Sequence, residues 1–235
     1  MKLGLNPKRP DQRHLHLREH LASPLLPPLA TWDGTPGAVI AMLANDTDGD
    51  CVLAAIGNGS SVQSACEGTP GLAFDAGEVR QLYRRLSPND TGLNMISTLS
   101  LVGREAFLGR RIPHFAGVDF ADRHAVMAAA CAFSGVAIGV ALPPDFQDQF
   151  DAGLFDATKP GDPELGHALY VVSYDDIGPD VATWGRVVPC TWDWFDYYVR
   201  EAYVLLDEAR AAASIDWQGL VEAAAELARQ TGAGG

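Results

Sequence analysis

The sequence predicts an α+β protein in which helical segments come first and an antiparallel, β-rich half follows. Helix-like periodicity dominates the first half of the chain, strand-like apolar runs dominate the second, and the two kinds do not alternate as a βαβ chain requires. The chain has 235 residues, of which 47% are hydrophobic and 20% charged. That length and composition are sufficient for one full hydrophobic core.

The chain divides into three parts by composition. Residues 1–30 form a proline-rich basic arm, residues 31–206 form the main domain, and residues 207–235 form a C-terminal helical extension. The whole chain has a net charge of −13, although residues 1–20 contain five Lys or Arg against two Asp or Glu. The arm is therefore either a solvated end or a segment that docks on its own acidic body or on a neighbouring subunit. The acidic body argues against nucleic acid as a partner.

Helices are predicted for most of the first half. The helix from Asp75 to Leu86 is the best defined, because Asp75 can cap its first turn and Glu78 follows three residues later. The other segments are predicted from apolar spacing and from proline and glycine. They are a short helix over 11–21, a turn over 32–36, an apolar segment over 38–43, a loop over 45–50, a helix from 51 that ends near 57–59 or continues to about 64, a helix over 94–108, a strand over 110–118 and a helix over 119–133.

Strands are predicted for most of the second half. Val136, Ile138 and Val140 alternate with small residues, which indicates a strand over 135–142. Glycine and proline make residues 145–165 loop-rich. The remaining segments are a strand over 167–174, a turn over 175–180, a return strand over 181–188, a short aromatic helix over 191–198, a strand over 201–206 and an amphipathic helix over 214–230.

The loop over 45–50 delivers a cysteine to the start of a helix. Gly49 and Asp50 precede Cys51, which opens an alanine-rich apolar stretch. A cysteine at a helix N-terminus lies at the positive end of the helix dipole, which favours the thiolate over the thiol. We therefore expect a thiol with a lowered pKa, facing an open crevice.

His167 stands far downstream, at the head of a strong hydrophobic strand. Cysteine-based acyl transfer requires a nucleophile and a base that are distant in the sequence and adjacent in the fold. Cys51 and His167 are the candidates for this pair. The four cysteines show no Cys-x-x-Cys pair, so free thiols are expected and a zinc site is not.

The segments Asn45-x-x-x-Gly49-Asp50-Cys51, Gly166-His167-Ala168 and Thr183-Trp184-Gly185 together resemble the papain-like cysteine peptidase superfamily. The resemblance is nearest to a bacterial and phage subgroup with an Asn-Asp-x-x-Gly-Asp-Cys motif, and it covers roughly residues 30–206. It implies a papain-like fold, in which a helical lobe bearing the nucleophile helix packs against an antiparallel β-rich lobe.

The resemblance also implies roles for single residues. Cys51 matches the nucleophile, His167 the general base and acid, and Asn45 the amide that joins the Cys51 N–H in an oxyanion hole. Trp184 matches the tryptophan that shields the histidine from water. The family normally has Asn or Asp just before the Trp-Gly pair to orient the histidine, whereas this chain has Thr183.

Four residues compete for the orienting role. The Thr183 hydroxyl is one candidate, and the carboxylates of the predicted hairpin turn, Asp175, Asp176 and Asp180, are the others. Without any of them the site is a bare Cys–His dyad or is inactive, since the orienting residue matters greatly in related triads.

The acidic loop does not fit a calcium site. Asp46, Asp48 and Asp50 match the first three ligand positions of an EF-hand, but Cys51 and Gly57 stand where glycine and glutamate are required. We predict no metal and no cofactor.

The leading prediction is a papain-like cysteine peptidase or isopeptidase with a protein or peptide substrate. The alternative is a non-enzymatic papain-fold protein with a degenerate site, for example a structural or assembly component of a phage particle that self-associates through its arm. No segment is apolar enough to span a bilayer. No export signal is evident either, so a cytoplasmic protein or a virion component is expected.

Overall fold

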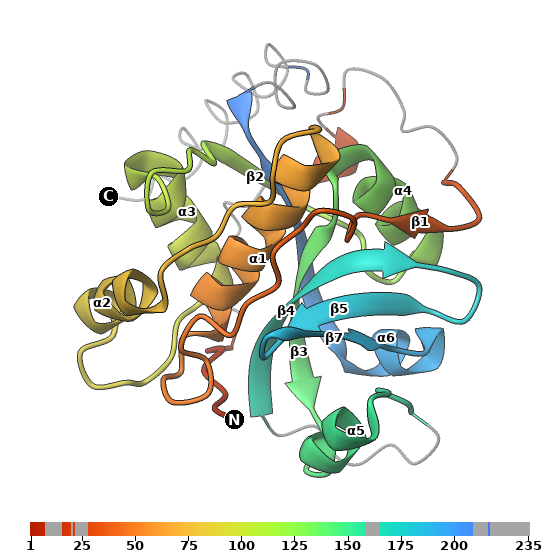
Figure 1. The fold of residues 1–235 in the computed structure, drawn as a ribbon. Helices are drawn as coiled ribbons and strands as arrows, with labels where there is room; N and C mark the ends of the chain where they lie inside the picture. The colour runs from red at the N-terminus through yellow and green to blue at the C-terminus, as the bar shows by residue number, and fades with distance from the viewer. Residues whose placement is uncertain (8–15, 20, 22–27, 158–164, 209–215, 217–235) are drawn as a thin grey trace, which may run out of the picture.

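The computed structural model describes residues 1–7, 16–19, 21, 28–157, 165–208 and 216 (Figure 1). Within these ranges the chain forms one antiparallel sheet and several surrounding helices. The helices are α1 (Cys51–Cys66), α2 (Ala76–Leu86), α3 (Met95–Glu105), α4 (Arg123–Phe133), α5 (Phe146–Ala152) and α6 (Trp192–Tyr198). The strands are β1 (Trp32–Asp33), β2 (His114–Gly117), β3 (Val136–Leu142), β4 (Leu165–Tyr174), β5 (Pro179–Thr183), β6 (Arg186–Pro189) and β7 (Val199–Leu206).

The sheet has the strand order β2-β7-β3-β4-β5-β6, and β1 adds to β4. All of these strand pairs are antiparallel. Alternate residues of β4 serve two hydrophobic cores, because successive side chains of a strand point to opposite faces. Tyr170 and Val172 join the core beneath α1, whereas Leu169 and Val171 join the core on the other face. The predicted α+β class, with a helical part packed on an antiparallel sheet, is confirmed.

Helix α1 runs without a break through Gly57 and Gly59 to Cys66, so the shorter of the two predicted helices is wrong. The helix is buried almost along its whole length, and its polar side chains bind neighbouring backbone. The Asn58 amide exchanges two hydrogen bonds with the backbone of Ala41, of 2.8 and 3.1 Å. Gln63 donates to the carbonyls of Phe133 and Leu205. These bonds pair buried polar groups, and those of Asn58 fix the chain that leads to the Asn45 loop.

Gly59 tolerates no side chain, because a Cβ there would overlap the ring of Tyr170. Gly59→Ala should therefore destabilise the protein, although alanine in a helix normally gains about 1 kcal/mol over glycine. Overpacking a rigid core typically costs about 1–3 kcal/mol. We expect a net loss of about 1–2 kcal/mol in the free energy of unfolding, measured in urea. Gly59→Ala should cost less free energy of unfolding in a Tyr170→Leu background than in the wild type, because the smaller side chain leaves room for the Cβ. An unchanged free energy of unfolding in Gly59→Ala alone would contradict this account.

Four predicted elements differ from the structure. The predicted turn over 32–36 begins as strand β1, which pairs with β4. The return strand over 181–188 is two strands, β5 and β6, because Trp184 and Gly185 have positive φ values of 43° and 72°. Positive φ at both central residues makes a tight hairpin turn. The loop-rich segment contains α5, whose Phe150 packs into the core. The strand over 110–118 is shortened to β2.

Most of the predicted helix over 11–21 lies outside the described residues, which exclude 8–15 and 20. Within its bounds the structure describes a 3₁₀ turn, Leu17–Glu19. The predicted helix over 214–230 also lies outside the described part, apart from residue 216, and so does most of the C-terminal extension. All four cysteines have free thiols. Among the described residues, no helix combines the length and the hydropathy that crossing a bilayer needs.

Candidate functional site

Cys51 is the first residue of α1, as predicted, and its thiol lies near the backbone N–H of Ala168. Ala168 follows His167 in β4, so the fold brings residue 51 to the strand position that bears the histidine. The packing of α1 on β4 causes this approach, because the two elements share the core beneath the helix. Two motifs 116 residues apart in the sequence therefore meet at one place in the structure.

The Cys51 side chain has no solvent exposure. This burial reverses the direction of the pKa shift that the sequence predicts for the thiol. Burial raises the pKa of the thiol to about 12, and the N–H groups of Ala168 and Gly4 only partly oppose it. The helix N-terminus favours a thiolate, but loss of hydration outweighs it in this form of the protein. The expected open crevice and lowered pKa are thus both absent from the structure.

His167 is fully buried in β4, and each ring nitrogen has a different environment. Nε2 lies 2.9 Å from Oγ1 of Thr183, within hydrogen-bonding distance. Nδ1 has no hydrogen-bond partner. Burial lowers the pKa of the imidazole to about 3. The ring is therefore neutral in this form, with one nitrogen at a hydroxyl and the other without a partner.

Thr183 is the candidate orienting residue that the structure places at the imidazole. The alternatives have other partners: the Asp175 carboxylate accepts from the backbone N–H groups of Ile177 and Gly178. Asp180 accepts from the Ser173 hydroxyl at 2.6 Å. Asp176 is exposed at the hairpin turn. Threonine, where the resemblance leads one to expect Asn or Asp, thus places a hydroxyl at Nε2 of His167.

Trp184 covers the imidazole, in the place that the sequence predicts for a shielding residue. Its ring stacks on His167 with centroids 4.1 Å apart and an interplanar angle of 13°. Phe146 and Phe150 of α5 pack against the indole in turn. The left-handed turn at Trp184 directs the side chain back over β4, which explains why the hairpin turn falls at this residue.

The donor of the Asn45 amide is already occupied. Nδ2 of Asn45 donates to the carbonyl oxygen of Lys2 at 3.3 Å and to that of Asp48 at 3.3 Å. Nε1 of Trp184 donates to the same Lys2 oxygen at 3.4 Å. A backbone carbonyl of the chain's own N-terminal segment therefore accepts from the proposed oxyanion donor.

Residues 1–7 cover the site, which sequence reasoning did not predict in this form. In Figure 1 the red N-terminal residues lie between the orange loop that leads to α1 and the start of β4. Leu5 donates to the carbonyl of Gly166 at 3.1 Å, and Lys2 forms an ion pair with Asp90. That ion pair and the Tyr83 hydroxyl lower the pKa of Asp90 to about 2. The basic arm above an acidic body was the only sequence signal of this docking.

Asp50 is a second feature that the sequence analysis assigned no role. Its carboxyl group is wholly buried immediately before Cys51, and neither oxygen has a partner with hydrogen-bonding geometry. Burial raises the pKa of Asp50 to about 7, opposed by the nearby Asn45 amide. A titratable group thus lies beside Cys51.

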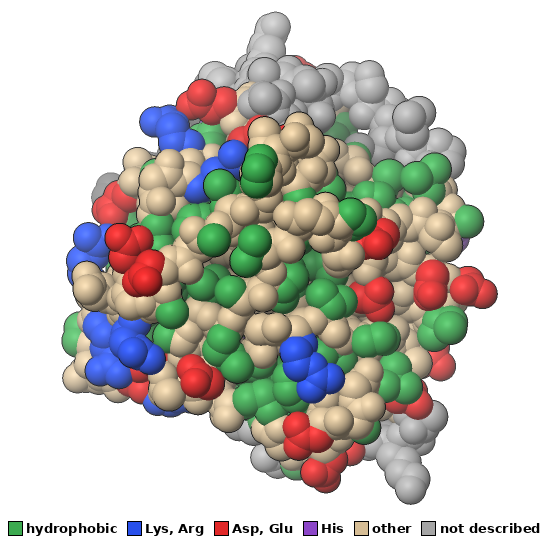
Figure 2. Space-filling model, viewed as in Figure 1, with side chains coloured by type: hydrophobic (Ala, Val, Ile, Leu, Met, Phe, Trp, Pro, Cys, Tyr) green, Lys and Arg blue, Asp and Glu red, His purple; other side chains and the backbone are tan. Residues whose placement is uncertain are grey.

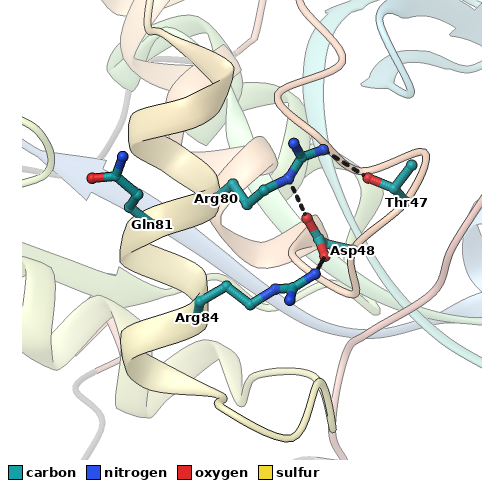
Figure 3. Close-up of a pocket in the computed structure, with 5 residues that line it drawn as sticks. All are labelled: Thr47, Asp48, Arg80, Gln81 and Arg84. Carbon is teal, nitrogen blue, oxygen red and sulfur yellow. Dashed lines mark hydrogen bonds and ion pairs between the residues drawn. The ribbon is translucent and has the colours of Figure 1, made fainter.

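The loop before Cys51 is braced from α2. The buried Asp48 carboxylate forms ion pairs with Arg80 and Arg84, and Arg80 also binds Thr47 (Figure 3). With Gln81 these residues line a hollow on the outer side of the loop, and Figure 2 shows basic side chains gathered there. The described residues contain no group of three His, Cys, Asp or Glu placed to hold a metal.

No protein-family model matches the sequence, and no curated protein matches it either. Solved structures do match the fold. Xylellain, a cysteine protease from Xylella fastidiosa, is 12% identical with a TM-score of 0.68, over 86% of this chain and 95% of its own.

A cysteine protease of Carica candamarcensis, solved with E-64, is 14% identical with a TM-score of 0.57, over 76% of this chain and 99% of its own. Digestive procathepsin L 3 from the larval midgut of Tenebrio molitor is 14% identical with a TM-score of 0.55, over 83% and 76% of the two chains. The chain therefore has the papain-like fold that the motifs predict.

Proposed function

We propose that this chain is a papain-like cysteine hydrolase that cleaves a peptide or isopeptide bond, described here in a closed and inactive form. Cys51 is the nucleophile, His167 the general base and acid, and Asn45 the oxyanion donor together with the Cys51 N–H. Thr183 positions the imidazole, and Trp184 excludes water from it. A protein or peptide is the proposed substrate class, because the backbone groups that bind residues 4–6 could bind another extended polypeptide.

The reaction needs only these groups. The Cys51 thiol gives its proton to Nδ1 of His167, and the sulfur attacks the carbonyl carbon of the amide. The oxygen that becomes negative accepts hydrogen bonds from Asn45 and the Cys51 backbone, an interaction typically worth about 3 kcal/mol for one donor. His167 then protonates the leaving amine, and water hydrolyses the thioester with the same imidazole as base.

The environment of His167 is the observation that supports this proposal most. Its Nε2 lies at a hydroxyl, its face is covered by an indole, and its Nδ1 alone lacks a partner. Buried polar groups are usually hydrogen-bonded, and an unpartnered imidazole nitrogen is what a proton acceptor in this closed form requires. The unpartnered nitrogen belongs to the residue that precedes the N–H near the Cys51 sulfur.

Burial explains why the described form is inactive. The pKa of Cys51 is raised to about 12 and that of His167 is lowered to about 3, so both groups are neutral. Displacing residues 1–7 admits water, which favours the charged forms of both groups. The thiolate–imidazolium pair can then form at the helix N-terminus.

The rival is a non-enzymatic structural or assembly protein that has kept the papain-like fold. The complete burial of Cys51 favours it, because a thiol without access to solvent meets no substrate. The two functions differ in whether the site ever opens.

Hydrolysis of denatured, fluorescently labelled casein by the full chain tests the proposal. Lys2→Glu is assayed beside the wild type, because it replaces the ion pair with Asp90 by repulsion and favours the open form. We expect hydrolysis that increases in Lys2→Glu and disappears in Cys51→Ala. Cys190→Ala, which removes an equally buried thiol elsewhere, is the matched control and should retain activity. Casein hydrolysis that survives in Cys51→Ala, or its absence from both Cys51-containing proteins, would favour the rival.

A further inference from the structure

The segment that covers Cys51 is bound as an extended strand. The Leu93 N–H donates to the carbonyl of Gly4 at 2.7 Å, and Asn6 donates to the carbonyl of Leu93 at 2.8 Å. On the other side Leu5 donates to Gly166 at 3.1 Å. These are backbone hydrogen bonds, which any extended polypeptide can form with the same two walls. The groove is therefore suited to a polypeptide strand.

Gly4 is the position where the groove becomes selective. Its N–H lies near the Cys51 sulfur, and a Cβ on Gly4 would overlap the carbonyl oxygen of Gly49. The Gly49 loop cannot easily withdraw, because its N–H donates to Asp90 at 3.0 Å. The Tyr83 hydroxyl holds the same Asp90 carboxylate at 2.7 Å. The space between Gly49 and Cys51 therefore accommodates a glycine but no residue with a Cβ atom.

Glycines line the walls of this passage as well. A Cβ on Gly92 would overlap the carbonyl oxygen of Gly4, and a Cβ on Gly166 would overlap that of Leu5. Close approach of two backbones is the usual reason for glycine at such positions. The flanking side chains are apolar: Leu3 packs against one hydrophobic core and Leu5 against the other.

We propose that the groove over Cys51 selects extended polypeptides with a glycine between two apolar residues, and that residues 2–6 are its resident occupant. This inference rests on the proposed function in one respect, namely that the substrate follows the same path through the groove as residues 2–6. Gly49 determines the specificity, because its backbone leaves no room for a side chain at the central position.

The test uses alkylation of the full chain by iodoacetamide, followed by mass spectrometry of each cysteine. Gly4→Val should displace residues 1–7 and increase the labelling of Cys51 on the order of 100-fold, since protection reports the opening equilibrium. Asn6→Ala, which keeps the glycine and the backbone contacts, is the control and should label slowly. Exposed Cys66 and buried Cys190 serve as fast and slow references within each protein. Unchanged labelling of Cys51 in Gly4→Val would overturn the proposal.

Peptides added in trans then test the selectivity. The capped peptide Lys-Leu-Gly-Leu-Asn, at about ten times its dissociation constant, should slow Cys51 labelling of Gly4→Val about tenfold. The peptide Lys-Leu-Ala-Leu-Asn should not protect at the same concentration. Equal protection by both peptides, or by neither, would refute the inference. If Gly4→Val also labels Cys190 rapidly and is therefore unfolded, Lys2→Glu takes its place in the same experiment.

The outcome is independent of catalysis, because protection from alkylation is measured without hydrolysis. A protein that binds the glycine peptide but leaves casein intact supports the inference and contradicts the hydrolase. A protein that cleaves casein and shows no preference for the glycine peptide supports the hydrolase and contradicts the inference.

Discussion

His167→Ala is expected to lower casein hydrolysis by about 10³-fold or more, because it removes both the acceptor of the thiol proton and the donor to the leaving amine. General acid–base catalysis by one positioned side chain typically contributes about 10²–10⁴-fold, and the loss of thiolate activation adds to it. The initial rate is measured in the Lys2→Glu protein, where the site is more open. Thermal unfolding of each variant shows whether the fold is retained.

Thr183 variants serve as the graded control for this prediction. Thr183→Ser keeps a hydroxyl for Nε2 of His167 and should retain most of the rate. Thr183→Val removes the hydroxyl with little change in volume, so Nε2 loses its partner and the imidazole its orientation. We expect a loss of about 10²-fold and a shifted pH profile of the rate. Equal rates for Thr183→Val and Thr183→Ser would contradict the positioning role.

Asp50→Asn is expected to stabilise the folded protein in a pH-dependent way. Burial raises the pKa of Asp50 in the folded state from 3.8 to about 7, so the folded state binds this proton more tightly than the unfolded state does. Stability therefore falls as the pH rises through this range. The advantage of the variant should grow by on the order of 3 kcal/mol between about pH 4.5 and about pH 8.

Urea unfolding of wild type and variant at several pH values measures this difference. Asp176→Asn is the matched control, because it removes an exposed carboxyl and should change stability little at any pH. An advantage of Asp50→Asn that is constant across the pH range would show that the Asp50 carboxyl is not responsible. A stability advantage of Asp50→Asn that increases as the pH falls would contradict the predicted direction of the pH dependence.

Local sequence signals were sufficient for most of the elements. The cap at Asp75 begins α2 where the sequence places it, and the side-chain oxygen of Asp75 accepts from the Glu78 N–H. The alternation at Val136, Ile138 and Val140 marks β3. These predictions hold because capping and strand alternation depend on residues that are close together in the chain. The Trp184–Gly185 turn was missed, since a positive φ at tryptophan follows from the packing of its ring on His167.

The same distinction between local sequence signals and tertiary contacts applies to the candidate site. The sequence by itself named the candidate side chains, Cys51, His167 and Asn45, because their types and order resemble a known pattern. Only the tertiary structure decided that Thr183, and not Asp175 or Asp180, lies at the imidazole.

The tertiary structure alone also decided the ionisation of the site. Residues 1–7 return across Cys51, and its burial raises the pKa of the thiol, opposite to the direction that the helix N-terminus implies. Burial also lowers the pKa of His167. Hydration depends on which distant segment covers a group, and such contacts are not encoded in the neighbouring residues. The sequence thus determined the chemistry that is available, and the fold determined whether water reaches it.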